Sequence, residues 1–389
     1  MRVLFNTWGW PTHFYPMAPL AWALRAAGHE VLAAVPPAQT HVVRATGTPA
    51  QAVGPDLDTV AMFRDIVEGT GSPGPSGVPR ASAIWLTLAE SMAADLVALA
   101  RAWRPDLVVF DPTSWAGPIA AAAVGVPAVR HPWGADIVGA MRARPGVAEA
   151  ESAAVASLCA RLGVREEAEL LGRLTVDPCP AGMQQPGLTH ERAPVRYVPY
   201  NGDRVRHVLP PSARPRICVT WGTTVGKVAP GRMPAGRIAR TLAGAGLDVV
   251  VAVDAAQRHL LGDLPGDLPG AVEVVESATL HTLLPGCRAV VGHGGAGTIF
   301  TGLVHGLPQM VLPLLPDHRF NAQRLAASGA GVVLGLEEAT DERVREEALR
   351  LLEEPAYAKA AGALGADIAA APAPAALVPR LARLTARPA

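Results

Sequence analysis

The sequence predicts an α/β protein with two parallel sheets, one in each half of the chain. First, apolar runs that fit strands alternate with longer segments that fit helices, and this pattern occurs twice in succession. Second, a Pro-rich stretch at 201–215, with Pro210, Pro211 and Pro215, separates the two patterns. Third, a length of 389 residues suits two domains of ordinary size. We therefore expect a first domain at 1–200, a linker at 201–215 and a second domain at 216–371.

The first half opens directly on a strand, and its Gly and Pro residues mark the breaks between elements. Strands are expected at 2–7, 30–35, 106–110 and 127–131, and helices at about 17–27, 82–103 and 115–124. Gly28 ends the first of these helices, as a C-terminal glycine predicts. The Gly- and Pro-rich segment 69–80 is expected to be a mobile loop, and 141–190 reads as partly helical without a strong strand.

The second half begins with the strand that ends at Thr220 and continues with strands separated by helices. These strands are expected at 247–253, 271–275, 289–292, 309–313 and 331–335. In open α/β sheets, ligands bind at the carboxyl ends of the strands. The polar motifs considered below all follow such strands.

Composition excludes several classes of protein. Lys plus Arg and Asp plus Glu each number 34, so the chain lacks the basic excess of a nucleic-acid-binding protein. No unbroken run of about 18 apolar residues predicts a membrane span, and the N-terminus reads as a strand rather than a signal peptide. The four cysteines are widely spaced, which is typical of buried thiols in a reducing, cytoplasmic compartment. No cluster of carboxylates predicts a metal site.

The stretch 290–298, Val-Val-Gly-His-Gly-Gly-Ala-Gly-Thr, is the most informative in the chain. It reads as a strand, a Gly-rich turn and the start of a helix that ends before Gly306 and Pro308. Such a turn directs backbone N–H groups and the positive end of the helix dipole at one point, which favours phosphate binding.

The same turn has the spacing of a dinucleotide fingerprint, from Gly292 through Gly294 to Gly297, with Asp317 20 residues further on. However, that fingerprint normally lies on the first βα turn of its domain, a place already taken by Thr220–Thr224. A nicotinamide-dependent oxidoreductase is therefore the less favoured alternative.

The turn at 220–224 carries hydroxyl groups, including that of Thr223. These hydroxyls are compatible with a phosphate contact or with an ordinary turn after a strand.

A polar cluster follows the next strand, at Asp317, His318 and Asn321. Carboxylate and imidazole groups hydrogen-bond sugar hydroxyls, although Asp317 also fits as a helix cap. Together with the glycine turn, the cluster indicates a nucleotide-sugar site.

His13 and Asp111 are the candidates for acid–base chemistry in the first half. His13 lies in the loop after the first strand, and Asp111 ends a buried strand. Free imidazole titrates near pH ~6.5, which suits proton removal from a hydroxyl. A carboxylate on one imidazole nitrogen would fix the tautomer. A loop or capping role for His13 and a helix N-cap role for Asp111 remain alternatives.

Aromatic residues are concentrated in the first half, where most are expected in the core. Trp8, Trp10 and Phe14 flank His13 in a loop and suit an apolar acceptor pocket. The candidate acceptor-binding residues are Trp8, Trp10, Phe14, Phe63, Trp85 and Trp133.

Four stretches then resemble a known family: 12–16 (Thr-His-Phe-Tyr-Pro), 27–31 (Ala-Gly-His-Glu-Val), 196–202 (Arg-Tyr-Val-Pro-Tyr-Asn-Gly) and 292–298. Together they resemble the inverting glycosyltransferases of the GT-B fold, most of all the actinobacterial enzymes that decorate polyketide and other antibiotic aglycones. The resemblance covers nearly the whole chain and is weakest at 55–105 and 141–190. It implies two Rossmann-like, doubly wound parallel-sheet domains facing across a cleft, with 372–389 packing back on the first domain.

The resemblance also implies roles for individual residues. His13 is similar to the base that deprotonates the acceptor hydroxyl, and Asp111 to its orienting partner. Ser277 and Leu280 match the region that packs on the nucleobase and ribose. The residues that resemble diphosphate contacts are Thr223, His293, Gly295, Ala296, Gly297 and Thr298. Asp317 and His318 match the pair that reads the donor sugar.

Many hexose-using relatives carry Gln where this chain has His318, so a deoxysugar carried by TDP is the expected donor. The expected partners are a nucleotide-sugar and a small-molecule aglycone, with no metal or other cofactor, no nucleic acid and no membrane. The alternatives are a UDP-hexose-dependent enzyme that inactivates an antibiotic, a C-glycosyltransferase, and a non-catalytic activator-type homologue. A homodimer is one open possibility.

Overall fold

The structure is a computed structural model that describes residues 1–69, 78–202 and 205–386, so most of the loop expected at 69–80 lies outside the described residues. The chain forms two units, each built on one parallel sheet. Unit 1 holds Met1–Pro178, Gln185–Val198 and Ala371–Ala389; unit 2 holds Cys179–Gln184 and Pro199–Ala370. The predicted α/β class is confirmed. Cys179–Gln184 belong with unit 2, unlike the contiguous first domain expected at 1–200. The C-terminal segment Ala371–Ala389 belongs with unit 1, the domain on which 372–389 was expected to pack.

Unit 1 contains a seven-stranded parallel sheet in the order β3-β2-β1-β4-β5-β6-β7. The register places Val3 beside Val31 on one neighbour and Leu107 on the other. The strands are β1 (Arg2–Asn6), β2 (Glu30–Val35), β3 (Ala50–Ala52), β4 (Leu107–Phe110), β5 (Ala128–Arg130), β6 (Leu174–Asp177) and β7 (Arg192–Pro194). The strand order reverses between β1 and β4, which is where open sheets bind ligands.

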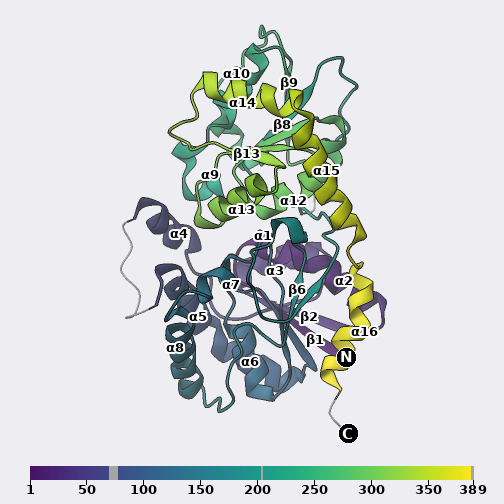
Figure 1. Ribbon diagram of the computed structural model, residues 1–389. Helices are drawn as coiled ribbons and strands as arrows, with labels where there is room; N and C mark the ends of the chain where they lie inside the picture. Colours follow the sequence, from purple (N-terminus) through teal and green to yellow (C-terminus); the bar gives the residue numbers. More distant parts are fainter. Residues whose placement is uncertain (70–77, 203–204, 387–389) are drawn as a thin grey trace. The chain divides into compact units, whose positions relative to one another are not determined.

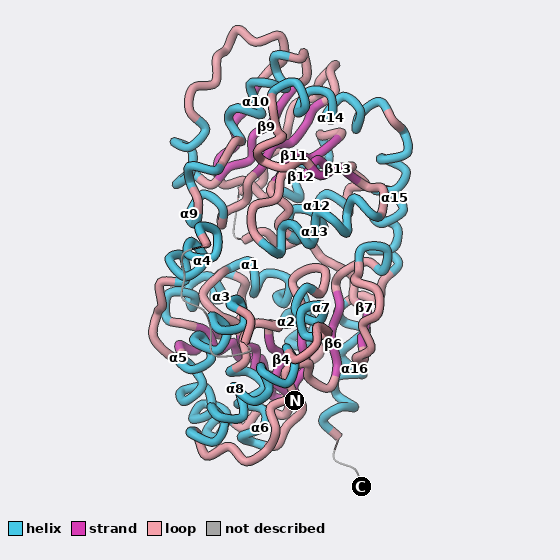
Figure 2. Tube along the Cα trace, turned by 60° about the vertical axis from the view of Figure 1, so that its left-hand side comes forward, coloured by secondary structure: helices cyan, strands magenta, loops and turns pink. Residues whose placement is uncertain are grey.

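Helices cover the sheet of unit 1, as the cyan segments around the magenta strands show (Figure 2). They are α1 (Pro11–Phe14), α2 (Ala18–Ala26), α3 (Thr40–Ala45), α4 (Thr59–Glu68), α5 (Arg80–Trp103), α6 (Ala116–Val124), α7 (Ile137–Arg142), α8 (Val147–Arg161) and α16 (Pro374–Thr385). By length and composition α5 could cross a membrane, but Leu88, Met92 and Leu96 along it are buried in the core with β4 and α6. We therefore describe α5 as a core helix.

The C-terminal helix α16 packs against α2 at the N-terminal end of the chain (Figure 1). The backbone N–H of Arg196 donates to the carbonyl of Pro372 at 2.8 Å, and the Arg380 guanidinium lies 2.6 Å from the Glu191 carboxylate. These contacts join the last helix to the rest of unit 1.

Unit 2 contains a six-stranded parallel sheet in the order β10-β9-β8-β11-β12-β13. Its strands are β8 (Arg216–Thr220), β9 (Asp248–Val253), β10 (Val272–Glu276), β11 (Ala289–Gly292), β12 (Gln309–Val311) and β13 (Gly331–Val333). Its helices are α9 (Val225–Val228), α10 (Ala235–Gly244), α11 (Leu280–Leu283), α12 (Ala296–Val304), α13 (Pro316–Ala327), α14 (Asp341–Glu353) and α15 (Pro355–Ala370). In the two units together, 3-10 helical turns occupy Tyr15–Met17, Pro37–Gln39, Ala181–Met183, Pro230–Arg232, Ala255–Leu261 and Leu284–Gly286.

The main difference from the sequence prediction lies at 141–190. This region contains the helix α8 and the four-residue strand β6, which is fully buried although it includes Thr175 and Asp177. A strand this short, with two polar residues, has no clear alternation or apolar run. The four cysteines are free and buried, as expected.

Candidate functional site

His13 and Asp111 come together because they follow neighbouring strands. β1 and β4 are paired, with Asn6 opposite Phe110 at their carboxyl ends. His13 lies in the short helix α1 that follows β1, and Asp111 comes directly after β4. The Nδ1 atom of His13 is 2.8 Å from Oδ2 of Asp111, and the Asp111 side chain has no exposed surface. Since Nδ1 is occupied by Asp111, Nε2 is the ring nitrogen available for a substrate.

The second oxygen of Asp111 is held by Thr113. The Thr113 backbone N–H donates to Asp111 Oδ1 at 2.9 Å, and the Thr113 hydroxyl donates to the same oxygen. Asp111 therefore caps the turn at Thr113 rather than helix α6, whose N-cap is Trp115 and has no side-chain hydrogen bond.

Aromatic rings surround the His13 imidazole. The ring centroid of His13 lies 4.7 Å from that of Trp8 and 4.4 Å from that of Trp133. Trp8 stacks in parallel on Phe63 at 5.5 Å, and Trp10 lies 4.5 Å from Phe63. The histidine is thus set in an apolar wall on unit 1.

The six aromatic residues expected at an acceptor pocket differ in exposure. Trp10, Phe63 and Trp133 keep some exposed surface, so acceptor contact by these three stays a prediction. Phe14 has no exposed surface, Trp8 is 1% exposed, and Trp85 is buried against Trp115 in the core. In this structure the side chains of Phe14, Trp8 and Trp85 therefore pack inside unit 1 instead of lining a pocket.

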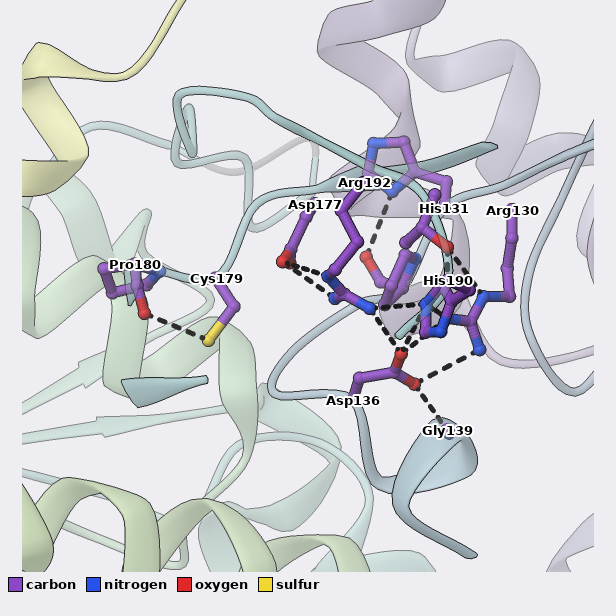
Figure 3. Close-up of polar contacts among 11 residues, drawn as sticks. Arg130, His131, Asp136, Gly139, Asp177, Cys179, Pro180, His190 and Arg192 are labelled. Atoms are coloured by element: carbon purple, nitrogen blue, oxygen red, sulfur yellow. Dashed lines mark hydrogen bonds and ion pairs between the residues drawn. The ribbon is translucent and has the colours of Figure 1, made fainter. Parts of the chain in front are cut away.

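A cluster of buried charges lies further along the same edge of the sheet, and sequence analysis did not identify it (Figure 3). Asp136 accepts hydrogen bonds from Arg130 at 2.5 Å and from Arg192 at 2.8 Å, and it also caps α7 through Gly139. Arg192 also binds Asp177, at the end of β6, at 2.7 Å. The guanidinium groups, together with hydrogen bonds to the carboxylate, hold the pKa of Asp136 well below its usual range despite burial. The cluster ties the ends of β5 and β6 to the start of β7.

In unit 2, the glycine turn leads from β11 into α12 as predicted. Gly294 has φ +95°, and a Cβ there would lie 2.8 Å from the backbone oxygen of His318. Gly295 is the N-cap of α12 and supplies no side chain to the first amides of the helix. Ala296, Gly297 and Thr298 form the first turn of the helix, at the positive end of its dipole.

His293 is buried at the start of this turn, between two glycines. A Cβ on Gly295 would lie 2.4 Å from His293 Nε2, and one on Gly222 would lie 2.8 Å from Cε1. Its buried Nδ1 has no hydrogen-bond partner among the described residues. Burial lowers the pKa of His293 to about 3, with a smaller effect from His318. The imidazole is therefore neutral at pH 7, with an unpaired polar atom beside an uncapped helix.

The loop after β12 lies against the glycine turn. His318 caps α13, its Nδ1 accepting a 3.4 Å hydrogen bond from the backbone N–H of Leu315. The alternative that Asp317 caps this helix is wrong, and Asp317 remains partly exposed in the first turn. Asn321 donates to the backbone carbonyl of Gly294 at 3.1 Å. Burial lowers the pKa of His318 to about 3.

The remaining donor candidates lie at the ends of β8 and β10. The carbonyl of Thr223 accepts a 2.8 Å hydrogen bond from Gln257, which fixes the turn after β8. Ser277 follows β10 with φ +51°, a strained conformation for a residue other than glycine. Leu280 is buried in the core of unit 2, so most of its side chain is inaccessible to a ligand.

Among the described residues, no group of three or more His, Cys, Asp or Glu side chains could hold a metal ion.

Sequence analysis missed Thr113 as well as the charge cluster. Thr113 lies two residues after Asp111, and an Asp side chain often accepts a hydrogen bond from the backbone two residues further on. This spacing could have predicted the contact from the sequence.

Comparison with known proteins assigns the family. Residues 22–222 match the erythromycin biosynthesis protein CIII-like N-terminal domain, and residues 238–384 match the corresponding C-terminal domain. This chain belongs to the erythromycin biosynthesis protein CIII-like family. It is a glycosyltransferase of the GT-B fold and of the type that acts on antibiotic natural products, which confirms the resemblance found in the sequence.

Individual relatives of this family align along the whole chain. A 10-deoxymethynolide desosaminyltransferase of Streptomyces venezuelae is 35% identical and aligns over 100% of this chain and 98% of its own. A TDP-daunosamine transferase of Streptomyces peucetius is also 35% identical, over 100% of this chain and 97% of its own. The solved structure of the glycosyltransferase VinC in complex with dTDP superposes with a TM-score of 0.81, at 33% identity, and covers 99% of both chains.

Proposed function

We propose that this glycosyltransferase moves a deoxysugar from TDP to a hydroxyl of an apolar polyketide-type aglycone, with inversion at the anomeric carbon. The observation that carries the proposal is the 2.8 Å contact between His13 Nδ1 and Asp111 Oδ2. It leaves Nε2 as the base for the acceptor, in an apolar wall formed by Trp10, Phe63 and Trp133. The acceptor then binds unit 1 and the donor binds unit 2.

Three features of unit 2 support a nucleoside diphosphate as the donor group. The N-terminus of α12 presents backbone amides and the positive end of a helix dipole. The neutral His293 beside it has a buried nitrogen without a partner among the described residues. Gly294 and Gly295 have no side chains that would cover this point. A diphosphate supplies the acceptor oxygens that such a site needs.

The choice of TDP and of a deoxysugar rests on relatives and on His318. One relative is named as a TDP-daunosamine transferase, and the VinC structure holds dTDP. His318 lies where many hexose-using relatives carry Gln, and here its imidazole is buried as a helix cap. A group used in this way cannot offer the two-sided hydrogen bonding of a free amide to a sugar that carries every hydroxyl.

The proposed reaction is a single displacement. His13 Nε2 accepts the proton of the acceptor hydroxyl while the oxygen attacks the anomeric carbon. The bond between that carbon and the diphosphate oxygen breaks, and TDP leaves with the bonding electrons. Asp111 holds the tautomer of His13 with a proton on Nδ1 and stabilises the imidazolium that forms. General base catalysis of this kind contributes ~10²–10⁴ in rate.

The dipole of α12 and the side chain of His293 stabilise the negative charge that develops on the leaving diphosphate. No step needs a divalent cation, so we expect full activity in the presence of a chelator.

The proposal is tested by calorimetric titration with TDP and UDP in EDTA, followed by transfer assays with a TDP-deoxysugar and macrolactone acceptors. We expect TDP to bind at least about 10-fold more tightly than UDP, and the product to have the opposite anomeric configuration to the donor by NMR. A preference for UDP would instead support a hexose donor and an antibiotic-inactivating role. Retained configuration would contradict the single displacement.

A further inference from the structure

A chain of hydrogen bonds runs from Trp8 through Thr113 to Asp111 and ends at His13. The indole Nε1 of Trp8 donates to the Thr113 hydroxyl at 2.6 Å, and that hydroxyl donates to Asp111 Oδ1. The other carboxylate oxygen, Oδ2, contacts His13 Nδ1. The ring of Trp8 also lies 4.7 Å from the ring of His13, so the first and last residues of the chain are in contact.

The direction of each bond in this chain is fixed by chemistry. An indole N–H can only donate, and an ionised carboxylate can only accept. The Thr113 hydroxyl must therefore accept from Trp8 and direct its single proton at Asp111. Because Thr113 holds Oδ1 with both its hydroxyl and its backbone N–H, the carboxylate cannot rotate away from His13 without breaking both bonds.

We propose that Thr113 and Trp8 are positioning residues for acceptor activation, which hold the Asp111 carboxylate so that Oδ2 faces His13 Nδ1. Both would act through the Asp111 carboxylate rather than by exchanging a proton with the acceptor. The inference rests on the proposed function, because it matters for the reaction only if His13 is the base.

A second buried imidazole, that of His131, lies close enough to Asp111 for the carboxylate to act on it electrostatically. His131 follows β5 and is buried, with Nδ1 3.0 Å from the carbonyl of Pro132. Burial lowers the pKa of His131 to about 4, so it is neutral at pH 7. Because a carbonyl can only accept, His131 directs its Nδ1 proton at Pro132, and it is His13 that contacts the Asp111 carboxylate.

The test compares Thr113→Val with Thr113→Ser. Valine keeps the shape of the side chain but has no hydroxyl, and serine restores the hydroxyl. We expect Thr113→Val to lower kcat by about 10-fold, the effect of losing one hydrogen bond to a charged group, with the Kd for TDP unchanged. Thr113→Ser should recover most of the loss. Ser114→Ala is the matched control, because the buried Ser114 hydroxyl has no partner among the described residues.

A spectroscopic readout separates positioning from a general loss of structure. The ¹⁵N chemical shifts of His13 report which ring nitrogen carries the proton. We expect the Nδ1–H tautomer to dominate in the unmodified enzyme and to lose population in Thr113→Val and, to a smaller extent, in Trp8→Phe.

Two results would overturn the inference, and they differ from failure of the proposed function. In the first, Thr113→Val keeps kcat within about twofold and leaves the His13 tautomer unchanged, while His13→Ala is inactive. His13 would then remain the base, and the positioning role of Thr113 would be wrong. If His13→Ala itself is active, the base assignment is wrong and the positioning role is lost with it.

Discussion

Asn321 donates a hydrogen bond to the backbone carbonyl of Gly294 across 3.1 Å, and this bond joins the two motifs of unit 2 that we propose bind the donor. Gly294 lies in the turn that leads into α12, and Asn321 lies on α13. The bond therefore links the glycine turn to the helix that carries Asp317 in its first turn.

Replacing Asn321 by Leu should weaken the donor site. The substitution leaves the buried carbonyl of Gly294 without a donor, which costs about 1–3 kcal/mol. We expect the Kd for TDP to rise by about 5- to 10-fold in calorimetry, with a lower melting temperature. Gln323→Leu, at an exposed position on the same helix, is the control and should change neither. An unchanged Kd for Asn321→Leu would show that the turn holds its shape without this bond.

Adding one methyl group at residue 295 should disturb nucleotide binding. In Gly295→Ala the new Cβ would lie 2.4 Å from His293 Nε2, so the imidazole must move. Overpacking of this kind costs about 1–3 kcal/mol, and we expect TDP affinity to fall by about 10-fold. Gly231→Ala is the matched control, since nothing lies within 4 Å of a Cβ there. Equal TDP affinity for the two variants would mean that His293 plays no part in the donor site.

Acid should unfold the protein through three buried histidines. Burial lowers the pKa of His131 to about 4, and those of His293 and His318 to about 3. The unfolded chain binds protons at these groups below pH ~6.5, whereas the folded protein does not until lower pH. Their contribution to stability is therefore complete above pH ~6.5 and is lost as the pH falls towards about 4 and then 3.

Each of these histidines should contribute up to ~1.4 kcal/mol per pH unit over that range. Urea unfolding at about pH 7.5, 6.5, 5.5 and 4.5, from above the unfolded pKa into the window, measures the slope. His318→Asn should make the slope shallower, whereas His41→Asn at an exposed position should leave it unchanged. Stability that does not vary across this range would argue against neutral buried imidazoles.

The charge cluster around Asp136 should be needed for the stability of unit 1. Asp136→Asn keeps an oxygen that can cap α7 but removes the charge that Arg130 and Arg192 share. Breaking a buried ion pair in this way costs about 3–5 kcal/mol. Glu90→Gln, which removes the exposed pair with Arg161, should cost less than about 1 kcal/mol. Denaturant unfolding monitored by circular dichroism compares them, and similar losses would contradict a structural role for the cluster.

Sequence reasoning located the parts of the site that depend on single strand ends. His13 follows β1 and Asp111 follows β4, and strands that pair in a parallel sheet bring their carboxyl ends together. The glycine turn before α12 was identifiable because a strand, three glycines and a helix stop are all local signals. For the same reason the strands and helices that were given bounds from the sequence lie within a few residues of them, whereas short elements such as β3, α3 and α4 were not predicted.

The parts that sequence reasoning missed depend on contacts between distant residues. Trp8 was interpreted as an acceptor contact, yet its indole donates to Thr113, 105 positions further on. Arg130, Asp136 and Arg192 each look like surface charges when read alone, and only the packing of β5, β6 and β7 makes them one buried cluster. Burial of Phe14 and Trp85 likewise follows from packing, because a large aromatic side chain is compatible with either a pocket or a core when read from the sequence alone.

The central claim is that His13 is the base, and it is tested most directly by comparing His13→Ala with the unmodified enzyme. The rate of sugar transfer and the Kd for TDP are measured on the same preparations. We expect transfer to fall by at least ~10²-fold while the Kd for TDP stays the same, because His13 lies on unit 1 and the proposed diphosphate site on unit 2. Transfer at the unmodified rate with TDP still bound would contradict the account.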